Sequence, residues 1–277
     1  MSMMDYSLKS VSEVSLADAA ALFTLAFTGY IAGHVEMNAT GLAALIARDN
    51  VDLNASRIQM LGEQAVGIAL IARQGWSSRV AAMGIIPEMQ GKKAGRWLLE
   101  QLRTEARNRS EKIMVLEAFE QNTRAVALYK GMGFEIVRRL YGYTADQIEA
   151  RGAAEAQEID PLEFGKQVAR EGAANLPWQV SGATFMRSGA PAKAYQLGEA
   201  YALVIPSTEN AVLRGLFVGG GARKQGQAAR MVRSLAALYP GRKWVVPQLC
   251  PEEYGGFFEQ MGFQRAPLHQ VQMLCEL

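Results

Sequence analysis

The sequence predicts an α/β protein made of two tandem copies of one unit. Helical and strand-like periodicities follow one another in the same order in both halves of the 277 residues. Short segments also recur, since YKGMGF at 129–134 is echoed by FEQMGF at 258–263 and QGKKAG at 90–95 by RKQGQA at 223–228. The two offsets, 129 and 133 residues, differ by only four, so a single small deletion aligns the halves.

The first half alternates helices and strands. Ser15 is a candidate N-cap for a helix over 15–27, and residues 56–86 read as three strands with turns at 62–63 and 75–76. An amphipathic helix at 94–109, a buried strand at 112–119, a short helix at 122–132 that Gly133 ends, and a strand at 134–143 follow. Residues 144–160 turn polar and rich in Ala and Glu, which suits a surface helix or a connector, so we place the domain boundary near 150 and expect domains over 1–150 and 151–277.

The second half repeats this order. Strands are expected at 200–207 and 211–218, a loop and helix at 222–239, a strand at 243–249, a helix at 252–261 and a last strand at 269–277.

Composition excludes several classes of function. The 29 Lys and Arg against 27 Asp and Glu leave a charge of +2, which draws the chain to neither nucleic acid nor an anionic membrane. No signal segment opens the sequence, and its most apolar early stretch, 17–27, has about half of the roughly 20 residues that a membrane span requires, so we expect a cytoplasmic protein. The only cysteines, Cys250 and Cys275, and the only histidines, His34 and His269, offer little material for a disulfide framework, a metal site or a Ser/His/Asp triad.

The QGKKAG loop raises the question of phosphate binding. A P-loop requires GxxxxGK followed by Ser or Thr, and a dinucleotide fingerprint requires GxGxxG after the first strand of a βαβ unit. Neither loop of this chain supplies either pattern. A nucleotide-binding α/β protein is therefore the weakest of the functions considered.

Both loops instead resemble the acyl-CoA loop of the GNAT acetyltransferases, whose signature is Gln or Arg, two residues, Gly, one residue, then Gly or Ala. Arg223, Gly226 and Ala228 fit it fully. In the first loop Gln90 and Gly95 fit, whereas Lys93 stands where the middle glycine belongs, either crowding a phosphate or pairing with one. Small residues there let backbone N–H groups point at a pyrophosphate at a helix N-terminus.

Residues 115–134, VLEAFEQNTRAVALYKGMGF, strengthen the resemblance. Glu117, Asn122, Tyr129, Gly133 and Phe134 fall at the spacing of the GNAT segment that follows its fifth strand. The resemblance covers both halves, and implies two tandem GNAT folds, each a mixed, mostly antiparallel twisted sheet flanked by helices. It also implies acetyl-CoA as co-substrate and no metal.

The resemblance assigns two catalytic candidates. Tyr129 matches the general acid that protonates the departing thiolate, although a core tyrosine with a hydrogen-bonded tip is the alternative. Glu117 matches a strand glutamate that serves as base, directly or through water, and the alternative is an ion-paired carboxylate. If Glu117 is not the base, a water chain or a residue of the substrate loop remains.

The resemblance also assigns binding residues. Met83 and Ile85 would offer backbone groups to the pantetheine, and Asn122 would contact the pantetheine or simply cap its helix. The pyrophosphate loop comprises Gln90, Gly91, Lys92, Lys93, Ala94, Gly95 and Arg96, and a second CoA loop comprises Val218, Arg223, Gly226 and Ala228. Tyr30, His34 and Glu36, between the first helices, are candidate substrate contacts, with an exposed loop as the alternative.

The copies differ in a way that bears on function. Phe258 stands in the place of Tyr129, and Pro251 in that of Asn122. We therefore expect the first domain to acetylate a primary amine of a small molecule or peptide, and the degenerate second domain to complete the acceptor cleft or hold an unproductive CoA. A non-catalytic acyl-CoA-binding or sensing protein is the alternative. A monomer with pseudo-dimeric domains and a homodimer are both compatible with the repeat.

Overall fold

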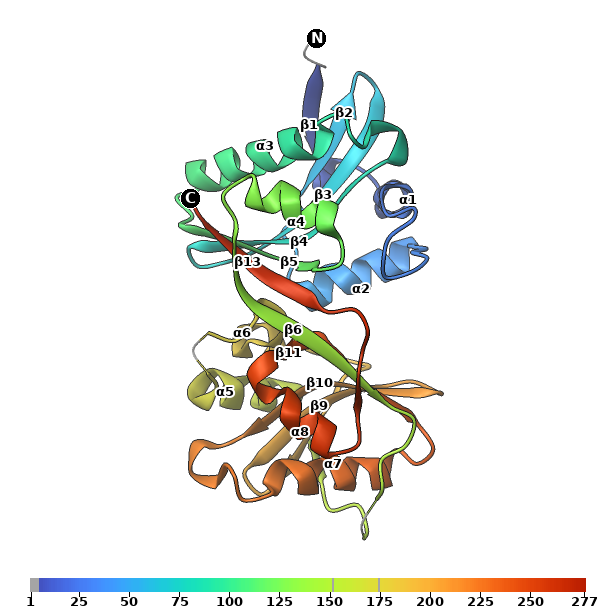
Figure 1. Cartoon of the computed structure of the whole chain (residues 1–277), viewed down its shortest axis with the longest axis vertical. Helices are drawn as coiled ribbons and strands as arrows, with labels where there is room; N and C mark the ends of the chain where they lie inside the picture. Colours follow the sequence, from blue (N-terminus) through green and yellow to red (C-terminus); the bar gives the residue numbers. More distant parts are fainter. Residues whose placement is uncertain (1–4, 151, 174) are drawn as a thin grey trace. The chain divides into compact units, whose positions relative to one another are not determined.

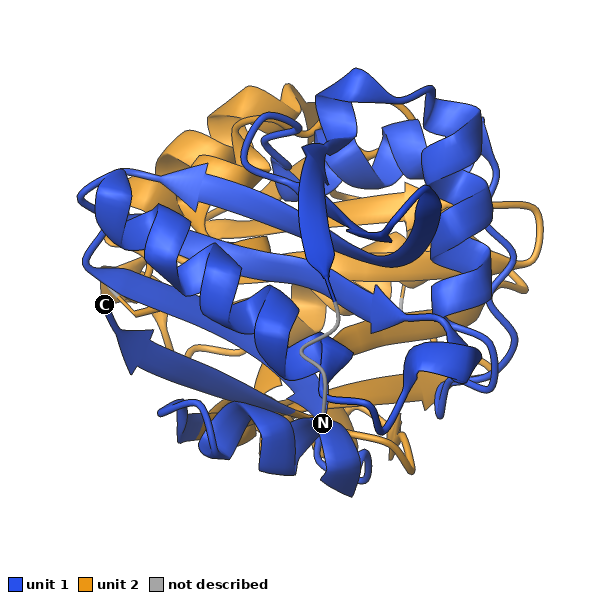
Figure 2. Ribbon diagram, turned by 90° about the horizontal axis from the view of Figure 1, so that it is seen from above, with its two compact units in different colours: residues 1–137, 271–277 blue, residues 138–270 orange. Residues whose placement is uncertain are grey.

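The computed structural model describes residues 5–150, 152–173 and 175–277 and divides into two compact units (Figures 1 and 2). The first unit comprises residues 1–137 and 271–277, and the second comprises residues 138–270. The domain boundary expected near residue 150 differs from this division in the assignment of two strands. The C-terminal strand β13 (Gln270–Glu276) counts with the first unit, and most of β6 (Glu135–Ala145) with the second.

The sheet of the first unit has the order β1-β2-β3-β4-β5-β13. Neighbours pair antiparallel from β1 to β4, whereas β4 and β5 pair parallel. This is the mixed, mostly antiparallel sheet that was predicted, and the turns at 62–63 and 75–76 fall between its strands as expected. The strands not yet given are β1 (Tyr6–Ser10), β2 (Arg57–Leu61), β3 (Gln64–Gln74), β4 (Ser77–Ile85) and β5 (Ile113–Phe119).

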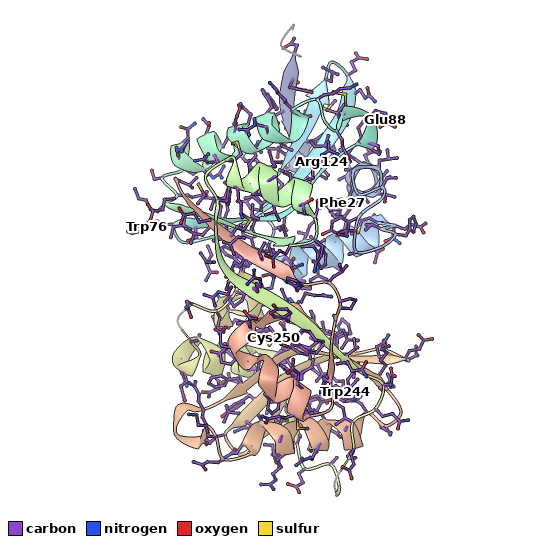
Figure 3. All side chains as sticks on the ribbon, viewed as in Figure 1. Phe27, Trp76, Glu88, Arg124, Trp244 and Cys250 are labelled. Carbon is purple, nitrogen blue, oxygen red and sulfur yellow. The ribbon has the colours of Figure 1, made fainter. Side chains whose placement is uncertain are left out.

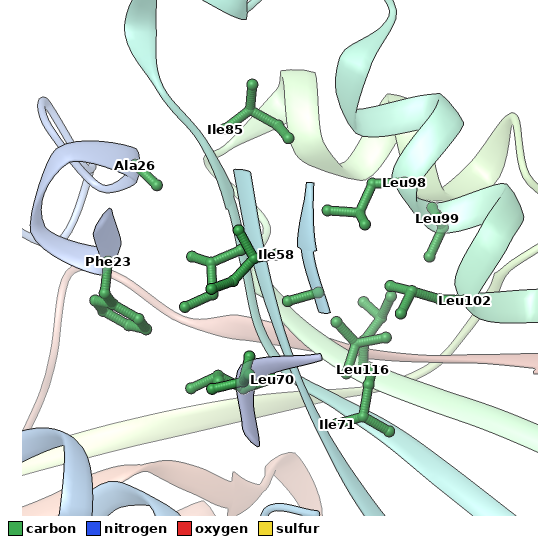
Figure 4. Close-up of a cluster of buried hydrophobic side chains, with 14 of the residues drawn as sticks. Phe23, Ala26, Ile58, Leu70, Ile71, Ile85, Leu98, Leu99, Leu102 and Leu116 are labelled. Carbon is green, nitrogen blue, oxygen red and sulfur yellow. The ribbon is translucent and has the colours of Figure 1, made fainter. Parts of the chain in front are cut away.

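The α-helices of the described part of this unit are α1 (Leu16–Ala26), α2 (Ala39–Asp49), α3 (Ala94–Asn108) and α4 (Thr123–Lys130). Ser15 caps α1 as predicted, because its side chain accepts a hydrogen bond from the Asp18 N–H. Figure 4 shows Phe23 and Ala26 of α1 on one side of the central strands, and three leucines of α3 on the other. The leucines, Leu98, Leu99 and Leu102, are at most 1% exposed, so α3 is fixed firmly against the sheet.

Strands β4 and β5 pair with each other along only part of their length. Their parallel register runs from Ser77 opposite Ile113 to Val80 opposite Leu116, and no further pair forms among the described residues. A bulge at Ala81 shifts the register of β4 against β3 at this point. Residues 81–85 and 117–119 lie beyond the last pair, and we call the unpaired stretch between these two segments the V-shaped opening.

The second unit repeats the architecture with the order β6-β11-β10-β9-β8-β7, and β12 (Gln264–Arg265) also pairs with β6. Its other strands are β7 (Gln157–Ile159), β8 (Lys193–Leu197), β9 (Ala200–Pro206), β10 (Asn210–Val218) and β11 (Lys243–Pro251). Its helices are α5 (Pro161–Glu171), α6 (Gly182–Phe185), α7 (Gln227–Leu238) and α8 (Gly255–Gln260). Strands β10 and β11 are the parallel pair, and their register stops after Val212 and Val245 among the described residues.

The predicted repeat is visible in backbone detail. Arg214 bulges out of β10 where Ala81 bulges out of β4, two steps after the parallel register's third pair. Gly133 and Gly262 both take left-handed conformations, with φ of 85° and 86°, at the ends of α4 and α8. Both ends are closed in the same way, as glycine C-caps are.

Other elements were not foreseen. Helices α2 and α5 were left out of the sequence prediction, although Asn38 and Asp160 cap them with their side chains. Residues 144–160 contain no helix in their described part, and act as a connector that ends in β7. No described helix has the length and apolarity needed to cross a membrane.

Candidate functional site

The loop between β4 and α3 has the geometry of an anion cradle. Lys93 is the N-cap of α3 and adopts a left-handed conformation, with φ 66° and ψ 7°. Among the described residues no side chain caps this helix, so the first N–H groups of α3, beginning with Ala94 and Gly95, are available to an anion. The side chains of Lys92 and Lys93 are exposed and add positive charge. The loop residues therefore fit a pyrophosphate.

Gln90 holds this loop in place. Its Nε2 donates a hydrogen bond to the Ile85 carbonyl at 3.0 Å, and its Oε1 accepts one from Arg124 at 3.2 Å. The first residue of the motif thus ties the loop back to the end of β4. Arg96, predicted with the loop, instead donates to the Gly131 carbonyl at 3.3 Å, at the far end of α4.

Arg124 is the cation that the sequence analysis missed. It comes from the first turn of α4 and is labelled in Figure 3, and its Nη2 lies 3.6 Å from the position that a Cβ of Gly91 would take. A cation in the first turn of a helix is disfavoured by the helix dipole. The position of Arg124, two residues after the N-cap Asn122, is therefore a sequence signal that this cation has a partner or ligand.

The second loop has the same construction. Arg223 donates from Nε to the Val218 carbonyl at 3.0 Å, which is the counterpart of the bond from Gln90 to Ile85. Gly226, with φ 75°, is the N-cap of α7 and again leaves the helix without a side-chain cap among the described residues. Lys224 is left-handed here, with φ 62°. Each loop thus has one glycine and one lysine in the left-handed conformation. The order is Gly91 then Lys93 in the first loop, and Lys224 then Gly226 in the second.

Tyr129 lies in the last turns of α4 with its side chain buried. Its ring packs edge-to-face against Phe134 at a centroid distance of 5.9 Å. Among the described residues its hydroxyl has no hydrogen-bond partner. Burial raises the pKa of this hydroxyl far above its usual value, and the neighbouring Tyr30 adds to the shift. Tyr129 therefore keeps its proton at neutral pH.

Tyr30, which adds to this pKa shift, contacts two further aromatic side chains. Phe27, at the end of α1, contacts Tyr30 at 5.2 Å, and Tyr30 contacts Phe119 at the end of β5 at 5.9 Å, measured between ring centroids. Of the predicted substrate contacts, the structure thus brings Tyr30 to the end of the V-shaped opening. His34 and Glu36 lie apart from it, since their side chains are 84% and 85% exposed and face each other across 4.0 Å.

Glu117 is buried in an ionic network. Its Oε2 is 2.7 Å from Arg79 Nε, and its Oε1 accepts a hydrogen bond from Gln272 of β13 at 3.3 Å. Arg79 also approaches Asp49, the last residue of α2, at 3.5 Å. The side chains of Arg79 and Glu117 are only 5% and 2% exposed. The carboxylate thus joins β5 to β4, α2 and β13 where the V-shaped opening begins.

The remaining predicted residues are structural in part. Asn122 caps α4, because its Oδ1 accepts a hydrogen bond from the Ala125 N–H at 3.2 Å. Met83 and Ile85 lie on β4 beyond the bulge, paired with Ala69 and Gly67 on β3, so the opposite edge of this segment borders the opening. Among the described residues, no group of three His, Cys, Asp or Glu side chains could hold a metal ion.

The second unit differs at each reactive position. The parallel registers begin at Ser77 and Ile113 in one unit and at Asn210 and Lys243 in the other. Val212 therefore corresponds to Arg79, and Pro247 to Glu117. A cavity of about 650 Å³ opens between β10 and β11, and Phe258 lies in its wall.

Part of the first unit matches a known protein family. Residues 20–134 match the family model described as Acetyltransferase (GNAT) family. No curated protein matches the chain at a significant level.

Solved structures of other proteins share the fold of nearly the whole chain, as three examples illustrate. A GCN5-related N-acetyltransferase from Sphaerobacter thermophilus is 12% identical, with a TM-score of 0.69 over 98% of this chain and 95% of its own. A tandem GNAT protein from the clavulanic acid biosynthesis pathway is 14% identical, with a TM-score of 0.67 over 98% of both chains. A GCN5-related N-acetyltransferase from Kribbella flavida is 15% identical, with a TM-score of 0.62 over 98% of this chain and 71% of its own. At these identities the likeness concerns the fold alone.

Proposed function

We propose that the first unit, whose residues 20–134 belong to the GNAT acetyltransferase family, transfers an acetyl group from acetyl-CoA to a primary amine. The observation that carries this proposal is Tyr129, whose ring is buried and whose hydroxyl has no hydrogen-bond partner among the described residues, in the same unit as a loop whose helix N-terminus has no side-chain cap. A hydroxyl that no protein group engages can donate its hydrogen to a bound ligand.

Residues of the loop between β4 and α3 would hold the pyrophosphate. The N–H groups from Ala94 onward, together with the charges of Lys92, Lys93 and Arg124, supply the donors. Met83 and Ile85 border the opening along which the pantetheine would lie. When bound, acetyl-CoA supplies a thioester carbonyl that an amine can attack, with a thiolate as leaving group.

Tyr129 is the proposed general acid. Its raised pKa keeps the hydroxyl protonated across the physiological range, so it has a proton to give to a leaving thiolate.

The proton of the acceptor ammonium needs another route. Both oxygens of Glu117 are engaged, one by Arg79 and one by Gln272, and this favours a positioning role for Glu117 over that of a base. The proton of the ammonium would then leave through a chain of water molecules, or the acceptor would bind as the neutral amine. Tyr30 and its aromatic neighbours Phe27 and Phe119 would contact the acceptor, a small molecule or peptide in the cytoplasm.

A turnover assay tests the proposal against its rival, an acyl-CoA-binding protein without activity. Thiol release from acetyl-CoA is followed with a panel of small amines and peptide N-termini. Release that depends on the amine supports the proposal. Tight binding of acetyl-CoA with no acetylation across the panel would favour the non-catalytic protein.

A further inference from the structure

The cavity of the second unit extends the opening between its parallel strands. It is lined by β10 from Leu213 to Val218 and by β11 from Val246 to Pro251, the stretches that follow the last paired residues. Its volume of about 650 Å³ lies within the range of roughly 300–1,000 Å³ typical of small-molecule sites.

One end of the cavity reaches the second loop. Val218, Arg223, Lys224 and Ala228 line it there. The N–H of Gly220, at the start of the loop, already donates to the Glu171 carboxylate at 3.1 Å, whereas the N-terminus of α7 has no side-chain cap among the described residues. An anion binding beside Ala228 would thus meet free N–H groups and the charge of Lys224.

Another part of the cavity wall is apolar. Phe164, Val168, Leu176, Val180 and Phe185, from α5 to α6, line it. Gly215 makes room for two of them, since a Cβ on it would come within 2.7 Å of the Phe164 ring and 2.9 Å of the Phe185 ring. Besides Arg223 and Lys224, the cavity wall contains the charged residues Arg214, which donates to the Gln179 carbonyl at 3.4 Å, and Glu253.

The positions of Tyr129, Arg79 and Glu117 carry other residues in the second unit, and the described residues with an acidic or phenolic group in the cavity wall are Glu253 and Tyr254. Phe258 replaces the tyrosine of the first unit, and Val212 and Pro247 replace its ion pair. Cys250, labelled in Figure 3, lines the cavity, but burial raises its pKa to about 12 and its Sγ–H points to the Pro251 carbonyl at 3.5 Å. It stays a thiol at neutral pH, and so does not act as a nucleophile.

We propose that the second unit is a binding site for an acyl-CoA whose acyl chain is longer than acetyl, held with its phosphates at Arg223–Ala228 and its chain among the aromatic and aliphatic side chains of α5 and α6. The site binds this ligand without transferring its acyl group. The proposal rests on the second loop holding CoA as proposed for the first.

Chain-length dependence of binding tests this site in the full-length protein. By calorimetry, affinity should rise from acetyl-CoA through butanoyl-CoA to octanoyl-CoA, because each buried methylene adds about 0.8 kcal/mol, or about fourfold. Since part of the chain stays exposed, we expect octanoyl-CoA to bind at least about tenfold more tightly than acetyl-CoA.

A matched pair of variants locates the binding. Gly256 is an exposed residue of α8 that lines the cavity, and a Cβ built on it meets no atom within 4 Å, so Gly256→Trp places a large ring at the edge of the cavity and Gly256→Ala leaves it open. We expect Gly256→Trp to lose the tight binding of octanoyl-CoA and Gly256→Ala to keep it, with circular dichroism and melting temperature showing that both fold. Lys224→Glu, in the exposed loop, should weaken the binding of octanoyl-CoA and leave the binding of octanoate unchanged.

Three results would overturn the proposal. Equal affinity for acetyl-CoA and octanoyl-CoA would show that no chain is buried. Unchanged octanoyl-CoA binding by folded Gly256→Trp would place it elsewhere. Octanoate competing as well as octanoyl-CoA would show a fatty-acid pocket that does not use the CoA loop. None of these outcomes depends on amine acetylation, so the first unit's activity is judged separately.

Discussion

Tyr129 and Phe258 hold the same backbone position in the two units and differ by one hydroxyl. The main-chain carbonyl of each accepts a hydrogen bond at 3.0 Å from the N–H of a phenylalanine five residues later, after a left-handed glycine. Both rings are buried. The fold therefore presents a proton donor in one unit and an inert ring in the other, which separates proposed chemistry from proposed binding.

The two helix N-caps predict reciprocal changes in stability. A left-handed conformation costs a residue with a Cβ about 1 kcal/mol relative to glycine, so Lys93→Gly should stabilise the protein by about 0.5–1 kcal/mol after the entropy of the unfolded chain is counted. Gly226→Lys should destabilise it by about 1 kcal/mol. Urea unfolding of both variants measures this, and a loss of stability in Lys93→Gly would contradict the assignment of strain.

Arg124 predicts an effect on cofactor binding alone. Removing a cation that meets a phosphate weakens ground state and transition state equally, so Arg124→Gln should raise the KM for acetyl-CoA about tenfold and leave kcat nearly unchanged. Lys130→Gln, which removes an exposed cation from the other end of α4, is the control and should change neither constant. If kcat falls in Arg124→Gln while KM stays constant, Arg124 has a role other than phosphate binding.

The Arg79–Glu117 pair predicts a large effect on stability. Replacing one member of a buried pair leaves the other charge uncompensated, so Glu117→Leu should lower the free energy of unfolding by about 3 kcal/mol. The double variant Arg79→Met, Glu117→Leu should lose clearly less free energy of unfolding than the sum of the losses in the two single variants. The pH–rate profile of Glu117→Gln tests the alternative role of a base. If this variant is as stable as the wild type, lacks the acidic limb of the profile and loses more than about a hundredfold in kcat, Glu117 is the base.

Tyr129 also predicts a pH dependence of stability. Its pKa is raised above the unfolded value of 10.0, so its contribution is fully present below pH 10 and is lost as the pH rises from there through the raised folded value. Between pH 10 and 11 the wild type should therefore lose stability more steeply than Tyr129→Phe. Parallel slopes for the two proteins in chemical unfolding would show that the tyrosine ionises as easily folded as unfolded.

Local features of the fold were predictable because they depend on near neighbours in sequence. Alternating apolar residues and left-handed glycines set the strands at 57–85 and the end of α4, and both were predicted. The exchange of β6 and β13 between the units was not, since a buried strand has the same residue pattern whichever sheet it joins.

The candidate site divides in the same manner. Tyr129 and the loop residues follow from motif spacing, whereas the partners of Glu117 lie 38 and 155 residues away in sequence, at Arg79 and Gln272. Nothing local in the sequence joins these side chains. Arg214 and Ala81, likewise, share a bulge that only the strand register reveals.

The most direct test of the proposed function compares wild type and Tyr129→Phe in amine-dependent release of thiol from acetyl-CoA. Loss of a general acid costs about a hundredfold to ten-thousandfold, so we expect kcat to fall by at least about a hundredfold with the KM for acetyl-CoA nearly unchanged. A Tyr129→Phe enzyme that folds and keeps the wild-type kcat at every pH would contradict the assignment of Tyr129 as the proton donor.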